Sequence, residues 1–198
     1  MTYKCINLEQ VYNWKMINSQ YNNQLQFAGA RNIRSHMWDG ASLPGSNEII
    51  RINNIDFLFP DKTCNKNDAI ECEGQIVDIN VKNVSNIYML SMTSDDATCM
   101  EKLIINYSDN EFEEQKVLFK EWYYLKSNTK WNYMQEQDKL TVEGMIGRHY
   151  SDKSKRCMYL NHIILKGKDV SSIELPFNPD IFIYAITVKG SDAYEIIK

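Results

Sequence analysis

The sequence predicts an all-β fold: a two-sheet antiparallel β-sandwich of the jelly-roll type, with at most one or two short helices. Short segments in which apolar and polar residues alternate recur from about residue 47 to residue 188. Nearly every segment is bounded by Asn, Asp, Gly or Ser, the residues that favour turns. Spacing that suits an amphipathic helix occurs only in residues 8–17, so helices are expected to be few.

The composition indicates one globular domain spanning residues 1–198. Hydrophobic residues make up 43% of the chain, aromatic residues 12% and charged residues 24%, with 8 Gly and only 4 Pro. These proportions suit a chain that buries a core and are unlike those of disordered proteins. A length of 198 residues suits one two-sheet core better than two independent cores.

Charge and hydropathy narrow the expected partners and location. The formal net charge is -4, which gives no overall attraction to nucleic acid or to an anionic membrane surface. Residues 1–9 lack the apolar segment of a secretory signal, and no later stretch has the length of a membrane span. We therefore expect a cytoplasmic protein with no nucleic-acid or membrane partner.

The cysteines carry no spacing typical of a zinc site, and their odd number is not that of a disulfide framework. Reduced and mostly buried thiols are expected in a cytoplasmic protein, with a bridge between Cys64 and Cys72 as the alternative. The five positions are Cys5, Cys64, Cys72, Cys99 and Cys157.

The first expected strands form a hairpin. Residues 48–52 and 55–59 have strand-like patterns and flank Asn53-Asn54. Asparagine tolerates the positive φ angles of tight hairpin turns, so this pair of residues is expected to form the turn. The second strand would place three apolar side chains on one face: Ile55, Phe57 and Phe59.

The remaining expected strands follow at short intervals. Residues 75–81 alternate so that Val77, Ile79 and Val81 would share one side. A polar turn at residues 108–111 predicts a second hairpin between residues 103–107 and 112–119. Further strands are expected at residues 87–92, 140–145, 158–165, 171–175 and 181–188.

Several segments stand in an order and spacing that resemble one known group of β-sandwiches. They are Tyr21-Asn22-Asn23, Trp38-Asp39-Gly40 and residues 68–76, 104–109, 119–122 and 175–187. Together they are similar to the carbohydrate-binding-like module that is appended to bacterial glycosidases. The resemblance implies a jelly-roll sandwich with a saccharide or another small polar molecule as its ligand. The chain departs from the pattern at residues 41–44, which are not rich in glycine, and at Asn110, which replaces a glycine.

Aromatic rings are the first candidates for a ligand site, because sugar-binding sandwiches stack a ring against the apolar face of a pyranose. Trp38 with the adjacent Asp39 is one candidate, and Trp131 with Tyr133 is another. The latter two lie in residues 126–138, which are expected to form an exposed loop. Trp122 is expected to pack in the core, since its counterpart in the resembling modules ends a strand.

Charged and amide side chains near the expected turns are the next candidates. His36 beside Asp39, and Arg148 with His149, would supply a titratable pair and an anion-binding fork if the loops meet at one end of the sandwich. His162 lies within an alternating strand and is interpreted as structural.

A Ca²⁺ ion is the one cofactor that the residue types allow. Its ligands would be oxygens of Asn23, Asp39 and Asp68. Turn formation by the same residues is the competing explanation, and no other cofactor is expected.

The motifs of nucleophilic and nucleotide-dependent catalysis are missing from the sequence: Gly-x-Ser-x-Gly, Gly-x-Gly-x-x-Gly and the Walker-type loop. The leading hypothesis is therefore a non-catalytic module that binds a saccharide or a similarly polyhydroxylated molecule. Two alternatives remain open. One is a stand-alone enzyme that uses His36, Glu73, Glu121 or His149 as acid or base, and the other is a scaffold or homodimer.

Overall fold

The computed structural model describes residues 1–18, 38–40, 43–63, 65–94, 98–121, 141–148 and 155–191. Within this part of the chain, the backbone alone is described at residues 18, 39, 141–148 and 155–157. The described residues contain no helix long and apolar enough to cross a membrane.

The described ranges form β-strands joined by turns, with no α-helix among them. The strands are β1 (Thr2–Ile6), β2 (Ile17–Asn18), β3 (Trp38–Asp39), β4 (Ile49–Ile52), β5 (Ile55–Leu58), β6 (Ile70–Glu73), β7 (Ile76–Thr93), β8 (Cys99–Tyr107), β9 (Phe112–Phe119), β10 (Thr141–Arg148), β11 (Lys155–Glu174) and β12 (Phe177–Gly190).

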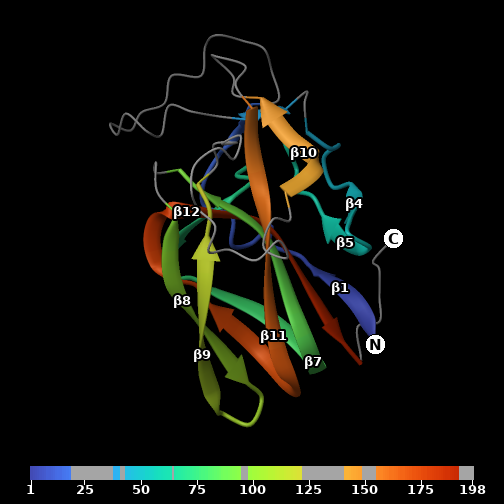
Figure 1. Cartoon of the computed structure of the whole chain (residues 1–198), viewed down its shortest axis with the longest axis vertical. Coiled ribbons are helices and arrows are strands. Elements are labelled where there is room, and N and C mark those ends of the chain that lie inside the picture. Colours follow the sequence, from blue (N-terminus) through green and yellow to red (C-terminus); the bar gives the residue numbers. More distant parts are fainter. Residues whose placement is uncertain are drawn as a thin grey trace, which may run out of the picture.

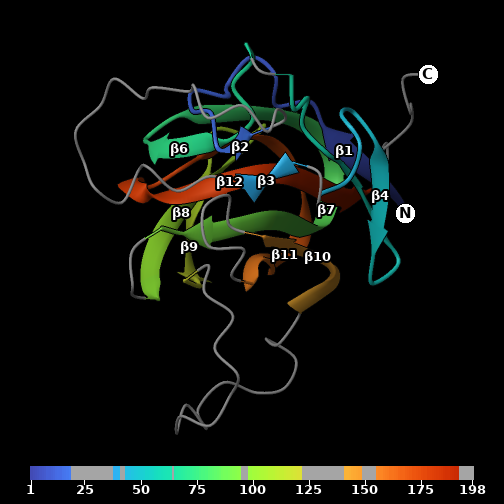
Figure 2. The same cartoon turned by 90° about the horizontal axis from the view of Figure 1, so that it is seen from above.

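Most strands belong to one antiparallel sheet. Its eight strands follow the order β1-β12-β7-β11-β8-β9, with β6 paired to β12 and β10 paired to β11 (Figure 1). Two small sheets, the parallel pair β2–β3 and the antiparallel hairpin β4–β5, complete the described fold. Figure 2 shows β2 and β3 lying along β12, and β5 packs against β1 and β12.

Long strands allow this one sheet to form both layers of the sandwich. The second half of β7 pairs with β12 and with residues 159–164 of β11, whereas its first half pairs with residues 170–174. Between these halves the register shifts, and positive φ angles of 50°, 48° and 76° occur at Asn80, Asn83 and Gly167. The strands bend at these positions. As a result, side chains of β8 and β9 meet those of β1 and β12 across one core.

Two hydrophobic cores lie on opposite faces of β7. The first core is enclosed by the folded sheet and includes Val77, Ile87 and Met89 of β7. The second core lies between the sheet and the small β2–β3 and β4–β5 sheets, and it includes Leu90 and Met92. Alternate residues of one strand therefore supply two separate cores.

The expected hairpin at residues 48–59 is confirmed. β4 and β5 pair in register from Ile49 with Leu58 to Ile52 with Ile55. Asn53 and Asn54 have φ angles of 49° and 63°, the combination that a two-residue type I′ turn requires. The three apolar residues expected on one face are all buried in the second core: Ile55, Phe57 and Phe59.

The hairpin at residues 103–119 is also confirmed. The Tyr107 N–H donates to the Glu111 carbonyl at 2.9 Å, and the Asn110 N–H donates to the Tyr107 carbonyl at 3.2 Å. Asn110 takes a φ angle of 65°, the left-handed conformation for which glycine is the usual residue. Asparagine is one of the few other residues that adopts this conformation, so the replacement preserves the turn.

Other expected segments are confirmed as strands but joined into longer ones. The single strand β7 contains residues 87–92 and all but the first of residues 75–81, and β11 contains residues 158–165 and all but the last of residues 171–175. Residues 141–145 of the strand expected at 140–145 lie in β10, and residues 181–188 lie in β12. The expected loop at residues 126–138 lies outside the described residues.

The helix considered for residues 8–17 is wrong. The N–H groups of Val11 and Tyr12 donate to the Leu8 carbonyl at 2.9 and 3.1 Å, which makes one turn that does not continue. Leu8 packs in the first core whereas Met16 and Ile17 pack in the second. These side chains must point in different directions, and one helical face cannot provide that arrangement.

The described thiols are free, as expected for a reduced protein. Cys72 is buried and unbridged, so the alternative of a Cys64–Cys72 disulfide is wrong. Cys5 and Cys99 form no disulfide either, and both are partly exposed. Burial raises the pKa of the Cys5 thiol above its ordinary value of 9.0, which disfavours the reactive thiolate.

The type I′ turn gives a stability prediction at Asn54. Asn54→Ala should lower the free energy of unfolding by about 1 kcal/mol, because alanine is strained at a positive φ angle. Asn54→Gly should not lower it, since glycine adopts this conformation without strain. Urea unfolding of the two variants beside the wild type measures the difference. Equal stability of the alanine and glycine variants would contradict the turn assignment.

Candidate functional site

Trp38, one of the expected sugar-stacking residues, is a core residue. Its indole is fully buried in the second core. Its Nε1 donates a hydrogen bond of 2.8 Å to the Tyr184 hydroxyl, and the two rings meet edge to face with centroids 6.3 Å apart. A ring without an exposed face cannot stack on a sugar. The expected platform at Trp38 is therefore wrong, because Tyr184 and the second core cover the indole.

Asp68, one of the expected Ca²⁺ ligands, is also fully buried. Its carboxylate lies 2.5 Å from the Lys15 ammonium and accepts the N–H groups of Met16 at 2.7 Å and Ile17 at 3.2 Å. These donors already occupy the oxygens that a cation would need. The expectation that Asp68 binds Ca²⁺ is therefore wrong. Asp68 instead forms a structural ion pair with Lys15. No group of three or more His, Cys, Asp or Glu side chains that could hold a metal occurs in the described part of the chain.

The other expected site residues stay predictions. The backbones of Asp39 and Arg148 lie in β3 and β10, but their side chains are outside the description. The remaining site residues lie outside the described ranges altogether: Asn23, His36, Trp131, Tyr133 and His149. Trp122, expected in the core, also lies outside them.

A buried polar network surrounds Asp68 and Trp38. The Tyr12 hydroxyl donates to the Tyr184 carbonyl at 2.7 Å, which ties residues 12–18 to β12. Burial raises the pKa of Asp68 from 3.8 to about 6, against the opposing effect of Lys15 and the two backbone N–H groups. Burial also raises the pKa of Tyr184 far above its ordinary value of 10.0. This network has no exposed group at Asp68, Trp38 or Tyr184, so we interpret it as an anchor rather than a site.

A small hollow lies at the surface beside residues 7–12. Its volume is about 70 Å³, well below the roughly 300–1,000 Å³ of small-molecule pockets. Lys66 closes part of it through ion pairs with Glu9 at 2.9 Å and Asp61 at 3.2 Å. The hollow holds waters at most, and its charges are paired within the chain.

The inner face of the sheet changes from apolar to polar at one end. Along β7, Ile87 and Met89 point into the first core, and the next two residues of that face are Ser91 and Thr93. Ser91 and Thr93 are fully buried. Buried polar side chains in a sandwich core need a structural or functional reason, because their desolvation is costly.

β11 supplies the matching polar residues across the sheet. Tyr159 pairs with Ser91, and Asn161 pairs with Met89, so both lie on the inner face. The Asn161 amide donates to the Ser91 hydroxyl at 2.7 Å. Met158 and Leu160, the intervening residues, point to the second core on the opposite face.

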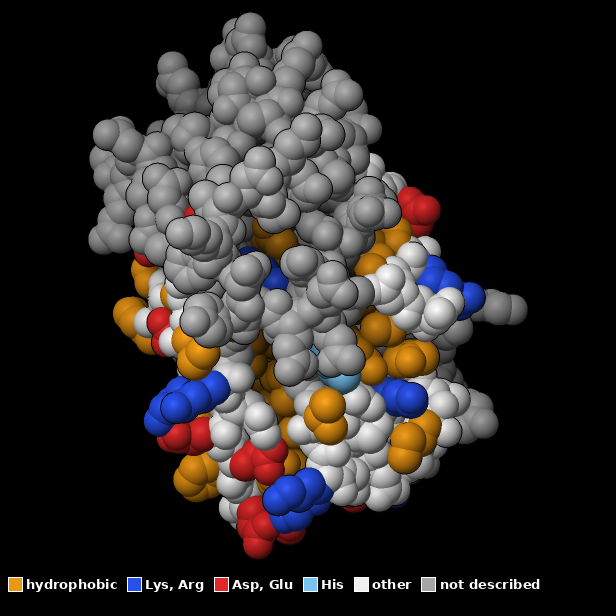
Figure 3. Space-filling view, viewed as in Figure 1, with side chains coloured by type: hydrophobic (Ala, Val, Ile, Leu, Met, Phe, Trp, Pro, Cys, Tyr) orange, Lys and Arg blue, Asp and Glu red, His pale blue; other side chains and the backbone are white. Residues whose placement is uncertain are grey.

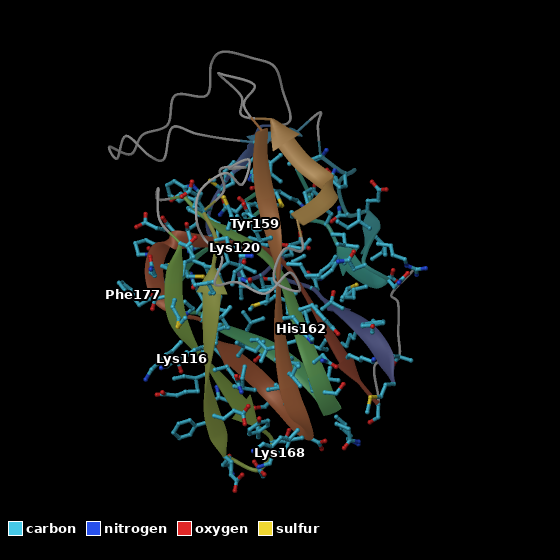
Figure 4. The ribbon with its side chains drawn as sticks, viewed as in Figure 1. Lys116, Lys120, Tyr159, His162, Lys168 and Phe177 are labelled. Atoms are coloured by element: carbon cyan, nitrogen blue, oxygen red, sulfur yellow. The ribbon has the colours of Figure 1, made fainter. Side chains whose placement is uncertain are left out.

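The end of β9 closes this region. The Thr93 N–H donates to the Lys120 carbonyl at 2.8 Å, and Glu121 forms a parallel bridge with Thr93. The Lys120 ammonium lies 5.7 Å from the centroid of the Tyr159 ring, a cation–π contact, and Figure 4 labels both residues in this part of the molecule. We call these residues the polar end: Ser91, Thr93, Lys120, Tyr159 and Asn161.

The outer face of the same strands carries His162, which was interpreted as structural. It is exposed, and its ring stacks on Tyr88 with centroids 4.6 Å apart and planes at 12°. Figure 4 labels His162 on this strand. Its Nε2 is hydrogen bonded to the Asn86 amide at 2.7 Å. Partial burial lowers the pKa of His162 below 6.5, which favours the neutral ring. Cross-strand stacking of this kind stabilises a sheet, so the structural interpretation accounts for it.

A family model described as the AziU2-like β-sandwich domain matches residues 4–192. The chain belongs to the AziU2-like β-sandwich family. No curated protein matches its sequence. The match confirms the sandwich architecture that the carbohydrate-binding resemblance implied. A link to carbohydrate binding or to glycosidases stays a prediction for this AziU2-like domain.

Sequence reasoning missed the polar end of the AziU2-like domain, although a signal for it exists. Ser91 stands two residues after Met89, and Asn161 stands two residues before Ile163, each in a strand-like run. A polar residue at an inward position of an otherwise apolar face is that signal. Using it requires the register between β7 and β11, which the sequence alone does not provide.

The buried ion pair gives a prediction for the AziU2-like domain. Lys15→Met should lower the free energy of unfolding by about 3–5 kcal/mol, because the Asp68 carboxylate would remain buried without its ammonium partner. Lys15→Met with Asp68→Asn should recover part of the loss. Lys66→Met removes two surface ion pairs, with Glu9 and Asp61, and should change stability by less than about 0.5 kcal/mol. Denaturant unfolding measures all three, and a Lys15→Met variant as stable as Lys66→Met would contradict the interpretation.

The raised pKa of Asp68 predicts a pH dependence of stability. The folded pKa of about 6 exceeds the ordinary value of 3.8, so the folded state holds a proton that the unfolded chain has lost between these values. The contribution of Asp68 to stability should therefore be largest below pH 4 and fall as the pH rises through about 6. Thermal unfolding of wild type and Asp68→Asn across this range isolates the contribution. If the stability of wild type relative to Asp68→Asn instead increased from pH 4 to 6, the pKa of Asp68 would be lowered by Lys15 more than it is raised by burial.

Proposed function

We propose that this chain is a non-catalytic binding domain that holds a saccharide or a similarly polyhydroxylated small molecule at the polar end. The observation that carries the proposal is the replacement of core residues by hydrogen-bonding ones on one end of the inner face, with Ser91 and Asn161 joined at 2.7 Å. The same sheet face is apolar along the rest of β7 and β11.

The residue types at the polar end support this class of ligand. The Tyr159 ring offers an apolar surface for a sugar face, and the Asn161 amide both donates and accepts hydrogen bonds. The Lys120 ammonium adds a further partner for hydroxyl groups, whereas the Ser91 and Thr93 hydroxyls are fully buried beside it. Together they form the small set of polar groups around a ring that binding sites for polar small molecules contain.

An enzyme is the second candidate, and one observation favours it. The bridge between Glu121 and Thr93 brings a residue with a carboxyl group to the polar end, where it would serve as a general acid or base. Glu73, another residue considered for that role, is exposed and accepts the Asn13 amide at 3.3 Å. Consumption of a compound that binds would favour the enzyme.

The binding proposal predicts the effect of two substitutions. Tyr159→Ala and Asn161→Ala should each weaken binding of a responding sugar or polyol by roughly tenfold, since each removes a contact worth about 1 kcal/mol or more. His162→Ala is the matched control: it lies on the same strand but on the outer face, so the affinity should not change. Isothermal titration with a panel of monosaccharides, disaccharides and polyols measures the affinities.

The result against the proposal is equally clear. A panel that gives no saturable heat, or a ligand whose affinity falls with His162→Ala and not with Tyr159→Ala, would remove the polar end as the binding site. Circular dichroism of each variant checks that the fold is intact.

A further inference from the structure

β9 forms one edge of the large sheet. It is the last strand in the order of the sheet, and no described strand pairs with residues 112–118 on its open side. Beyond the end of β9, Thr93 of β7 bridges Glu121. The hydrogen bond from the Tyr107 N–H to the Glu111 carbonyl fixes the alternation of the β8–β9 ladder. Residues 113, 115 and 117 therefore bond to β8, and residues 112, 114, 116 and 118 direct their N–H and C=O groups to the open side.

The side chains of those four residues form a self-complementary row. Their order along β9 is apolar, acidic, basic and apolar: Phe112, Glu114, Lys116 and Leu118. They share the outer face of the sheet, because Val117 and Phe119 point into the first core. Figure 4 labels Lys116 on this strand.

A second copy in antiparallel orientation matches this row in one register. With a two-fold axis at Gln115, Glu114 faces Lys116 of the second copy, and the reverse pair forms by symmetry. Phe112 then faces Leu118 of the second copy. The backbones also match in this register. Each of these residues directs its N–H and C=O groups to the open side, so the facing residues can form hydrogen-bonded pairs.

The neighbouring registers are disfavoured by charge. Moving the axis to Glu114 places two carboxylates opposite each other, and moving it to Lys116 places two ammonium groups opposite each other. Like charges directly opposite destabilise a strand pair, whereas opposite charges stabilise it. The charges therefore select the register centred on Gln115.

The surroundings of the row suit a contact that excludes water. Glu114 already binds Lys102 of β8 at 2.6 Å, so a second lysine would flank its carboxylate on the open side. Phe112 is 65% exposed, and Met100, which pairs with Leu118, is 62% exposed. Figure 3 shows hydrophobic side chains among charged ones at the surface on the side where Figure 1 places β8 and β9.

We propose that two copies of this chain associate through β9, antiparallel about a two-fold axis at Gln115, so that their sheets join into one. An open edge strand is a general hazard, and lysine on the edge is a common protection against unwanted pairing. Here the lysine is matched by an acid two residues away. The charges of Glu114 and Lys116 thus disfavour pairing with other strands and favour pairing with a second copy.

The test uses charge reversal in the full chain. Sedimentation velocity and light scattering, from low micromolar to near-millimolar protein, should show a dimer that forms with concentration. Lys116→Glu should raise its dissociation constant by at least about tenfold, because both symmetric ion pairs become repulsive. Glu114→Lys should have a similar effect.

A mixture of the two variants gives the sharpest result. Lys116→Glu carries acids at both positions and Glu114→Lys carries bases at both, so one copy of each should form a mixed dimer with an affinity within about threefold of wild type. Formation of that mixed dimer also shows that each variant folds. Lys82→Glu on β7, outside the hairpin, is the charge control and should leave the association unchanged.

A backbone variant separates strand pairing from charge. Lys116→Pro removes an N–H on the open side and none of those that bond to β8, so it should abolish the dimer and retain the circular dichroism of the fold. A wild type that is monomeric over the whole range overturns the proposal. So does a dimer that persists in Lys116→Glu, or a mixture of the two charge variants that remains monomeric.

Discussion

One constraint shapes the rest of the molecule: β7 is buried on both faces from residue 87 to residue 93. A strand in this position must have a neighbour on each edge, because unpaired backbone groups in an apolar interior are costly. β11 and β12 provide those neighbours. Each face also needs its own cover, which the folded sheet supplies on one side and the small sheets supply on the other. The sandwich is thus organised outward from β7.

The same strand shows how far sequence patterns reach. Val77, Ile79 and Val81 alternate with exposed residues because that half of β7 is buried on one face, and their shared side was predictable. Beyond residue 87 both faces are buried and the alternation vanishes, so periodicity cannot assign residues to a core. The segment 82–86, which is polar except for Val84, divided the prediction into two strands. Asn80 and Asn83, with positive φ angles, instead let one strand bend and continue.

The candidate site was less predictable than the fold because it depends on contacts between distant residues. The Asn53-Asn54 turn is a local feature, so its residues identified it. Trp38 is covered by Tyr184, which lies 146 positions later, and nothing near Trp38 in the sequence signals this burial. Ser91 and Asn161 are separated by 70 positions and meet only because β7 and β11 pair. A pattern around either residue alone cannot reveal that meeting.

The pairing of β1 with β12 has a consequence for how the chain folds as it is made. Thr2 lies opposite Gly190, so the first strand leaves the ribosome long before its neighbour exists. At ordinary rates of synthesis the delay is roughly 10–40 s. β12 also borders β7, and neither core is complete until that final strand has emerged. The nascent chain therefore carries exposed strand edges for most of its synthesis, and such edges are prone to aggregation.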